Sequence, residues 1–379
     1  MAGFPAVLVT GPRQSGKSTF LKEELGEACA YVTFDDPLVR ERARTDPKGL
    51  LDQFPGTVVV LDEVQYVPEI LPHVKMRADA GPSRATRWVM TGSQRFELMR
   101  HVTESLAGRV CILELLPFSL RELAGAGAGS LADMLWRGFY PPAALALAER
   151  DLWVRSYVQS YIERDVRALQ QVRDLRLFET FLGLIAASHA QTVNLASVSR
   201  DAGVSQPACR QWLSVLEASY VVALLPPYHR NLGKRLVKSP KVYLLDTAIA
   251  GYLTRQPSPA SMLAGSMAGA FFEGFVVCEA LKAFTNRGRR PEVYFWRSHD
   301  GLEVDLLIEA GGKVHPVEIK LTATPMPRHA EGLTKFRALL GPGACAPGVV
   351  VCSVEHPAPL ADNVSAMPWQ HFPDWVASL

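Results

Sequence analysis

The sequence lacks the features that would tie it to an oxidising compartment. Its six cysteines are scattered and include no C-x-x-C pair, which argues against a disulfide framework or a zinc site and favours reduced thiols. The first residues also lack the charged region and the long apolar region of a secretory signal. The chain is therefore predicted to be cytoplasmic.

A membrane span is not expected either. The apolar stretch 261–281 is long enough to span a bilayer, but it contains Glu273 and Glu279 and is broken by three glycines. We predict that it is a buried helix of a soluble protein and that the chain has no membrane partner.

The chain has little net charge. Its 40 basic and 38 acidic residues leave a formal charge of +2, so any basic surface must be local. The 48% apolar content over 379 residues excludes a disordered chain and predicts two or three domains.

A phosphate-binding loop is predicted near the N-terminus. The apolar run Ala6–Thr10 is followed by G-P-R-Q-S-G-K-S and then by a helical pattern. In a strand, G-x-x-x-x-G-K-S loop and helix, the glycines let backbone N–H groups face phosphates, Lys17 reaches the β and γ oxygens, and Ser18 ligates Mg²⁺. The predicted ligands are ATP and Mg²⁺. The predicted nucleotide-binding residues are Gly11, Pro12, Arg13, Gln14, Ser15, Gly16, Lys17, Ser18 and Thr19.

A pair of acidic residues follows the next buried strand. The run Thr57–Leu61 ends in Asp62 and Glu63, and the carboxyl end of a parallel strand faces the ligand crevice of an α/β sheet. This Walker B arrangement predicts that Asp62 holds Mg²⁺ and that Glu63 polarises the attacking water.

Two further residues are candidates for catalysis. Ser93 follows a third apolar strand and is predicted to sense the γ-phosphate. Arg109 precedes a strand that runs from Val110 to Leu116, and it is either an arginine finger, acting in cis or in trans, or a solvated side chain.

Together these motifs resemble a known family. The family is the prokaryotic AAA-type ATPases that carry a C-terminal domain of unknown function, and the resemblance covers nearly the whole chain. It rests on G-P-R-Q-S-G-K-S-T, V-V-L-D-E-V-Q, T-G-S-Q, L-A-G-R, L-x-P-F-S, W-R-G-F-Y-P, Y-I-E-R-D-V and K-S-P-K-V-Y-L-L-D-T. We expect a homo-oligomeric ring, with a hexamer as one possible size.

The middle of the chain is the candidate DNA-binding region. Leu116–Pro142 is rich in Gly, Ala and Pro and is predicted to be a loop or hinge. The following segment Arg150–Lys241 has 13 basic and 7 acidic residues. Leu195–Pro207 is typical of a helix, a turn at Gly203 and a second helix, and two strands could form a wing. The domain then either contacts DNA or packs subunits. The predicted DNA contacts are Gln206 and Arg210 in the major groove and Arg230, Lys234, Arg235 and Lys238 at phosphates.

The C-terminal region contains charged residues in a familiar order. Glu273 lies on a predicted helix, Asp305 lies in a strand, and Glu318 and Lys320 share a face of the next strand. This order resembles the PD-(D/E)xK restriction-endonuclease-like core. The resemblance implies that Asp305 and Glu318 bind a second Mg²⁺, that Lys320 orients or activates water, and that Glu273 completes the site. The alternative is a charged sheet edge, and whether the site cuts DNA stays open.

An aromatic run precedes this site. Tyr294–Trp296, next to Arg297, either stacks on bases or forms the first core strand of the C-terminal sheet, and we favour the core strand.

The predicted fold class is α/β throughout. We expect an AAA-type P-loop ATPase domain with a parallel sheet at 1–142, a helical and winged-helix domain at 143–256, and a restriction-endonuclease-like α/β domain at 257–379. The predicted function is Mg²⁺-dependent ATP hydrolysis coupled to DNA binding and to remodelling or translocation. The alternatives are a nucleotide switch that controls a protein partner and an ATP-licensed nuclease.

Overall fold

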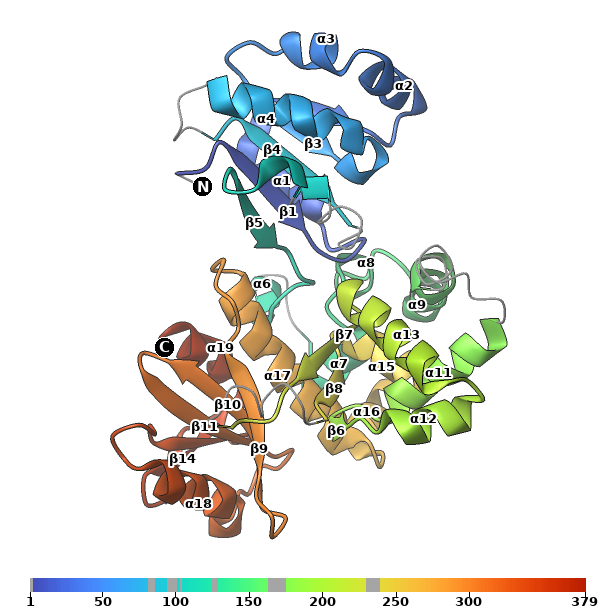
Figure 1. Cartoon of the computed structure of the whole chain (residues 1–379). Helices are drawn as coiled ribbons and strands as arrows, with labels where there is room; N and C mark the ends of the chain where they lie inside the picture. The colour runs from blue at the N-terminus through green and yellow to red at the C-terminus, as the bar shows by residue number, and fades with distance from the viewer. Residues whose placement is uncertain are drawn as a thin grey trace. The chain divides into compact units, whose positions relative to one another are not determined.

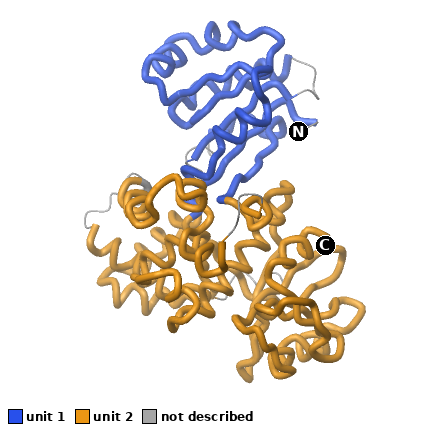
Figure 2. The backbone as a smooth tube through the Cα atoms, turned by 180° about the vertical axis from the view of Figure 1, so that it is seen from behind, with its two compact units in different colours: residues 1–117, 218–220 blue, residues 118–217, 221–379 orange. Residues whose placement is uncertain are grey.

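A computed structural model describes residues 3–80, 86–93, 101–102, 104–124, 129–162, 175–229 and 239–379. The chain forms two units, shown in Figure 2. The first contains Met1–Pro117 and Ala218–Tyr220, and the second contains Phe118–Glu217 and Val221–Leu379. The chain passes from the first unit to the second inside the L-x-P-F-S motif.

Five parallel strands form the sheet of the first unit (Figure 1). They are β1 (Ala6–Thr10), β2 (Cys29–Thr33), β3 (Val58–Asp62), β4 (Trp88–Gly92) and β5 (Val110–Glu114). Their order is β2-β3-β4-β1-β5, and every neighbouring pair is parallel. The predicted parallel sheet is confirmed, and β2 is an edge strand that the sequence analysis did not identify.

Helices cover both faces of this sheet. They are α1 (Lys17–Leu25), α2 (Pro37–Thr45), α3 (Pro47–Asp52) and α4 (Leu71–Ala80). Alternate residues of β1 point to opposite faces. Val7 packs in a core cluster with Leu21 of α1, whereas Leu8 packs in another with Val74 of α4. This packing explains why β1 and β4 are buried along their whole length.

The second unit begins with short helices. They are α6 (Leu120–Ala124), α7 (Leu131–Arg137), α8 (Pro141–Ala144) and α9 (Arg150–Tyr157), followed by a π-helical turn, η4 (Val158–Ile162). The prediction that Leu116–Pro142 is a loop or hinge is therefore wrong where α6, α7 and the start of α8 lie, and it holds for the described residues between these helices. The reason is local: alanine is a strong helix former, and Ser130 caps α7 by accepting a hydrogen bond from the Asp133 N–H group.

A helix pair and a small sheet follow. The helices are α11 (Leu175–Ala187), α12 (Leu195–Ala202) and α13 (Gln206–Ala218), and the strands are β6 (Gln191–Thr192), β7 (Val222–Leu225) and β8 (Lys241–Leu244). Gly203 ends α12 in the left-handed conformation with φ of 69°. The predicted helix, turn, helix and two strands are all present, with β8 paired antiparallel to β6 and β7. The winged-helix classification of this segment stays a proposal.

The remainder of the chain forms a six-stranded mixed sheet with helices (Figure 1). Its strand order is β13-β14-β12-β11-β10-β9. The strands are β9 (Val293–Arg297), β10 (Glu303–Ala310), β11 (Lys313–Ile319), β12 (Gly348–Cys352), β13 (Ala358–Ala361) and β14 (Val364–Pro368). The helices are α15 (Thr247–Leu253), α16 (Pro259–Ala264), α17 (Ala268–Thr285), α18 (Glu331–Leu340) and α19 (Phe372–Ala377). The larger core cluster of the second unit includes residues from Leu120 to Val376, and a smaller cluster includes Tyr228, Tyr294 and Phe336.

The apolar stretch 261–281 contains parts of two helices rather than one. Helix α16 ends at Ala264, the C-cap is Gly265, and α17 begins at Ala268. The prediction of one continuous helix is wrong because the glycine ends α16, whereas the predicted burial holds for most of α17. In the described part of the chain, no helix is both long enough and apolar enough to cross a membrane.

A buried ion pair on α17 holds the start of the second unit. Lys282 and Glu279 are each 1% exposed, and their charged atoms lie 3.0 Å apart. Lys282 donates to the carbonyl oxygen of Phe118 at 2.7 Å, and the Leu120 N–H group donates to Glu279 at 2.8 Å. Helix α17 therefore anchors the chain at Phe118 and Leu120, where the second unit begins.

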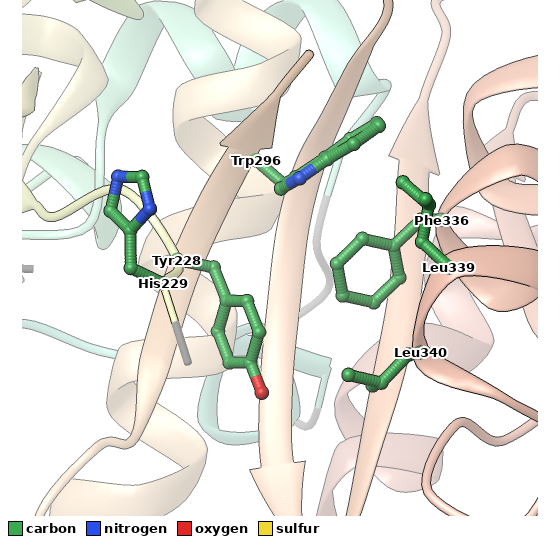
Figure 3. Close-up of a pocket in the computed structure, with 6 residues that line it drawn as sticks. All are labelled: Tyr228, His229, Trp296, Phe336, Leu339 and Leu340. Carbon is green, nitrogen blue, oxygen red and sulfur yellow. The ribbon is translucent and has the colours of Figure 1, made fainter. Parts of the chain in front are cut away.

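The aromatic run of β9 belongs to the protein core. Trp296 stacks edge-on against Phe336 of α18 with ring centroids 5.4 Å apart, and Tyr294 packs against Tyr228 at 5.6 Å. Figure 3 shows Trp296 and Tyr228 beside a pocket of about 150 Å³ that is also lined by His229, Phe336, Leu339 and Leu340. These contacts support the core-strand interpretation of Tyr294–Trp296.

Candidate functional site

The phosphate-binding loop connects β1 to α1. Gly11 and Gly16 adopt φ values of 150° and 92°, which favour glycine. A Cβ atom on Gly11 would lie 2.1 Å from the carbonyl oxygen of Leu115, so this position has no room for a side chain. Pro12 and Ser15 are buried, Gln14 and Thr19 are exposed, and Arg13 is half-buried. The backbone has the shape that the motif predicted, with α1 beginning at Lys17.

Lys17 is folded onto this loop. It is 5% exposed, and its ammonium donates to the carbonyl oxygens of Pro12 at 2.7 Å and Gly11 at 3.2 Å. Burial lowers the pKa of Lys17 to about 8, against the opposing effect of Glu63 and Asp62. A negatively charged ligand in the loop would favour the protonated lysine.

Asp62 faces the beginning of α1. The Ser18 hydroxyl donates to the Asp62 carboxylate, with oxygen–oxygen distances of 3.1 and 3.2 Å. Thr91 of β4 donates to the same carboxylate. A hydroxyl and a carboxylate from the two motifs thus lie together, and oxygen donors of this kind suit Mg²⁺. The residues present therefore fit the metal that a nucleotide would bring.

Glu63 is held in an unusual conformation beside this pair. Its φ of 56° is left-handed, which is uncommon for a residue other than glycine. Its N–H group donates to Thr91 Oγ1 at 2.9 Å, and Ser93 donates to Glu63 Oε2 at 3.1 Å. Gln65 donates to the same carboxylate oxygen. The structure thus gathers Ser18, Asp62, Glu63 and Ser93 at the carboxyl ends of the strands.

Two residues of this site were missed by the sequence analysis. Thr91 contacts both Asp62 and Glu63, and Tyr31 of β2 lies beside Ser18 and Asp62. Burial raises the pKa of Tyr31 above its usual value. Thr91 is part of the T-G-S-Q motif. Its contacts with Asp62 and Glu63 depend on the alignment of β4 with β3, which a short motif does not reveal.

Arg109 lies at the other end of the sheet. It precedes β5, and Ala6 at the start of β1 donates its N–H group to the Arg109 carbonyl at 3.2 Å. Because strands rise about 3.3 Å per residue, Arg109 is on the order of 15 Å from the phosphate-binding loop of its own chain. Its guanidinium forms an exposed ion pair with Asp79, whose pKa is lowered by those hydrogen bonds. A role in trans stays a proposal.

The candidate DNA contacts are only partly described. Gln206 and Arg210 are both exposed on α13, four residues apart and therefore on one face. Arg230, Lys234, Arg235 and Lys238 lie outside the described residues.

The C-terminal candidates lie close together. The Lys320 ammonium is 2.7 Å from Glu318 and 3.3 Å from Asp305, and the Ile319 N–H group donates to Asp305 at 2.9 Å. Glu273 of α17 lies near Asp305, because the Lys241 ammonium is 2.8 Å from Glu273 and 3.9 Å from Asp305. The structure therefore places Glu273, Asp305, Glu318 and Lys320 close together, as we expected from their order in the sequence.

Three more side chains of this cluster were missed. Lys241 of β8 contacts Glu273 at 2.8 Å, Glu303 by an ion pair, and Asp305 at 3.9 Å. Tyr243 also donates to Glu273, at 2.6 Å. The K-S-P-K-V-Y motif contained Lys241 and Tyr243, but their distance from Glu273 in the sequence concealed the contact.

The acidic side chains of this cluster shift one another's pKa values. Burial, together with Asp305, raises the pKa of Glu273 to about 7 against the effect of Lys241. Burial and Asp305 likewise raise the pKa of Glu318 to about 8 against Lys320. Even so, within the described ranges no three His, Cys, Asp or Glu side chains are placed to hold a metal ion. The implied second Mg²⁺ thus does not fit the cluster as it stands.

Three family models match consecutive segments. An AAA domain matches residues 3–124, a domain of unknown function, DUF8612, matches 128–260, and another, DUF4143, matches 268–372. The AAA domain includes the phosphate-binding loop, Asp62, Glu63 and Ser93. The Lys241 contacts join residues of the two domains of unknown function.

Solved structures give weaker likenesses. The Thermotoga maritima RuvB Holliday junction branch migration motor is 19% identical with a TM-score of 0.29, over 59% of this chain and 82% of that one. The Vibrio cholerae protein VC1899 is 10% identical with a TM-score of 0.22, over 98% and 96%. Similarity this low identifies neither a fold nor a function.

Two curated relatives match over most of their length. They are the uncharacterized proteins Rv2008c of Mycobacterium tuberculosis and Mb2031c of Mycobacterium bovis, and each is 33% identical over 369 residues. Each match covers 96% of this chain and 80% of the relative. The chain belongs to the family of these mycobacterial proteins, and it contains an AAA domain followed by a C-terminal DUF4143 domain.

Proposed function

We propose that the chain hydrolyses ATP with Mg²⁺ and couples turnover to binding and remodelling of DNA, or to translocation on it, as a cytoplasmic oligomeric ring. The observation that carries the hydrolytic part is the pair of contacts from Ser18 to Asp62 and from Ser93 to Glu63 at one edge of the sheet. Both carboxylates are fixed by hydrogen bonds before any ligand binds, as a preorganised site requires.

Each residue then has a distinct task. Lys17 exchanges its hydrogen bonds to the loop carbonyls for phosphate oxygens and keeps its proton. Ser18 and Asp62 hold Mg²⁺, which neutralises phosphate charge when bound. Glu63 accepts a proton from the attacking water, and Ser93 fixes the orientation of that carboxylate.

The DNA part is supported by two observations. The segment Arg150–Lys241 has six more basic than acidic residues, and Gln206 and Arg210 share an exposed face of the second helix of a helix pair. A helix in this position reads base edges from the major groove in helix-turn-helix proteins. The rival is a nucleotide switch that controls a protein partner and ignores DNA.

ATP hydrolysis measured with and without duplex and branched DNA separates these functions. We expect several-fold stimulation by DNA, with Lys17→Ala as the control for contaminating ATPases. The double variant Gln206→Ala/Arg210→Ala should lose stimulation, whereas Arg289→Ala, which removes an exposed charge elsewhere, should keep it. Hydrolysis that is indifferent to DNA would favour the switch, and no hydrolysis at all would refute both.

Assembly is tested by measuring the mass of the particle with and without a non-hydrolysable ATP analogue. If nucleotides bind between the subunits of a ring, the analogue should cause the ring to assemble or should lower its dissociation constant. Arg109→Ala should abolish hydrolysis in that assembly if Arg109 reaches a neighbour's nucleotide. A particle that stays monomeric with the analogue and DNA would exclude the ring.

A further inference from the structure

Lys241 occupies the centre of the carboxylate cluster. Its ammonium lies within ion-pair distance of Glu273, Glu303 and Asp305, which come from α17 and β10. The Lys241 side chain is 3% exposed, so these carboxylates replace water around the charge. Burial alone would lower the pKa of Lys241, but the three carboxylates outweigh it and raise the pKa. The lysine is therefore held as a buried cation by these three carboxylates.

The charges around Lys241 nearly balance. Glu273, Glu303, Asp305 and Glu318 face the cations Lys241, Lys320 and Arg297. Four acidic side chains therefore meet three cations. With all four ionised, as a bound metal ion would require, removing Lys241 would leave an excess of two negative charges, which one divalent ion matches.

One oxygen of the cluster has no partner. Glu318 is 8% exposed, and its Oε2 atom is buried without a hydrogen bond to any described residue. A buried carboxylate oxygen without a partner is costly, and it is the kind of ligand that a hard divalent cation takes. The cluster therefore contains the donors for a cation, while an amine already lies among them.

We propose that the Lys241 ammonium occupies the cation position of this cluster, so that the chain itself fills a site that Mg²⁺ or Mn²⁺ would otherwise bind. The C-terminal domain then holds its carboxylates together without a metal. Lys241 comes from the DUF8612 segment, whereas the carboxylates belong to the DUF4143 segment. A lysine of the DUF8612 segment thus fills a cation position in the DUF4143 segment. This proposal does not depend on ATP hydrolysis.

Mn²⁺ binding, followed by the loss of the free-ion EPR signal, tests the proposal on the full chain without nucleotide. The variant Lys241→Met should bind one more Mn²⁺ per chain than the unmodified protein. Its dissociation constant for Mn²⁺ at the cluster should be at least tenfold lower than that of the unmodified protein. Lys241→Arg, which keeps a cation, should bind like the unmodified protein. The double variant Lys241→Met/Asp305→Asn should lose the additional ion, which separates this site from the phosphate-binding loop.

Circular dichroism and thermal melting show whether the variants fold, and Lys241→Gln replaces the methionine variant if that one does not. A folded Lys241→Met protein that binds no additional Mn²⁺ would overturn the proposal. A second measurement needs no change at Lys241. If the unmodified chain binds Mn²⁺ and Asp305→Asn abolishes that binding, the cation position is open and the proposal is wrong. If Asp305→Asn leaves Mn²⁺ binding unchanged, the position is closed as proposed.

Discussion

Ser93 donates a hydrogen bond to Glu63 across 3.1 Å, which joins the end of β4 to the residue that follows β3. The Glu63 backbone is itself tied to Thr91 at 2.9 Å. The carboxylate is therefore fixed at its backbone and at its side chain. If Glu63 is the general base, as we propose, a carboxylate positioned in this way needs little reorganisation when water and nucleotide arrive.

The first prediction concerns Glu63. Glu63→Gln keeps the shape of the side chain but removes the proton acceptor, so ATP hydrolysis should fall about 100-fold or more. ATP binding should persist, because Lys17 and Ser18 are unchanged. Steady-state hydrolysis and equilibrium binding of a fluorescent ATP analogue measure the two effects. Hydrolysis at the unmodified rate would remove Glu63 from the reaction.

The second prediction concerns Ser93. Ser93→Ala removes one hydrogen bond to a charged oxygen, so kcat should fall about tenfold, since 1.4 kcal/mol corresponds to that factor. The Michaelis constant should change little if Ser93 only orients Glu63. Ser93→Thr keeps the hydroxyl and should recover most of the rate. Equal loss in both variants would indicate that packing at this position matters more than the hydroxyl.

The sequence alone predicted those parts of the site that are local in the chain. Gly11, Gly16, Lys17 and Ser18 lie in one turn, and their spacing sets the loop geometry by itself. Asp62 was also identifiable because a buried strand ends there. In contrast, Thr91 acts through the pairing of β4 with β3, and sheet register is not written in any short motif.

In the fold, too, contacts between neighbouring elements of the sequence could be predicted, whereas contacts between distant elements could not. The sequence predicted the two strands that contain Asp305 and Glu318, and these two residues lie close together because β10 and β11 are consecutive antiparallel strands. Lys241 reaches that cluster from a different sheet. Its contact depends on the packing of β8 against α17, which is a tertiary property.

The third prediction follows from the burial of Lys17. Its pKa of about 8 in the free protein means that it is largely neutral at pH 9. Phosphate oxygens favour the charged amine, so ATP binding at pH 9 should take up a proton, and ATP affinity should fall as the pH rises through 8. Calorimetry in two buffers of different ionisation enthalpy measures this uptake. Lys17→Arg, which stays charged, should show none, and equal uptake by both proteins would assign the proton to another group.

The fourth prediction concerns the buried pair on α17. Glu279→Gln leaves the Lys282 charge buried with a weaker partner, and breaking a buried pair typically costs about 3–5 kcal/mol. Urea unfolding should show this loss. Arg121→Met is the matched control, because it removes an ion pair with Asp374 that is mostly exposed, and it should cost far less. Equal costs would mean that the buried pair contributes no more than a surface pair.

The fifth prediction concerns Glu318 and the pH dependence of stability. The pKa of Glu318 is raised from 4.5 to about 8, so the folded chain holds this proton more tightly than the unfolded chain does. The resulting stabilisation is complete below pH 4.5 and is lost as the pH rises through 8. Glutamine resembles the protonated acid and does not titrate.

The melting temperature of the unmodified protein should therefore fall relative to that of Glu318→Gln as the pH is raised from 5 to 9. The glutamine variant also loses the ion pair with Lys320, which shifts its melting temperature by a constant amount. The change of the melting-temperature difference with pH is therefore the informative quantity. Glu355→Gln, at an exposed position, should show no such slope. If the two glutamine variants behave alike, the proton on Glu318 contributes nothing to the fold, and the carboxylate is ionised throughout this range.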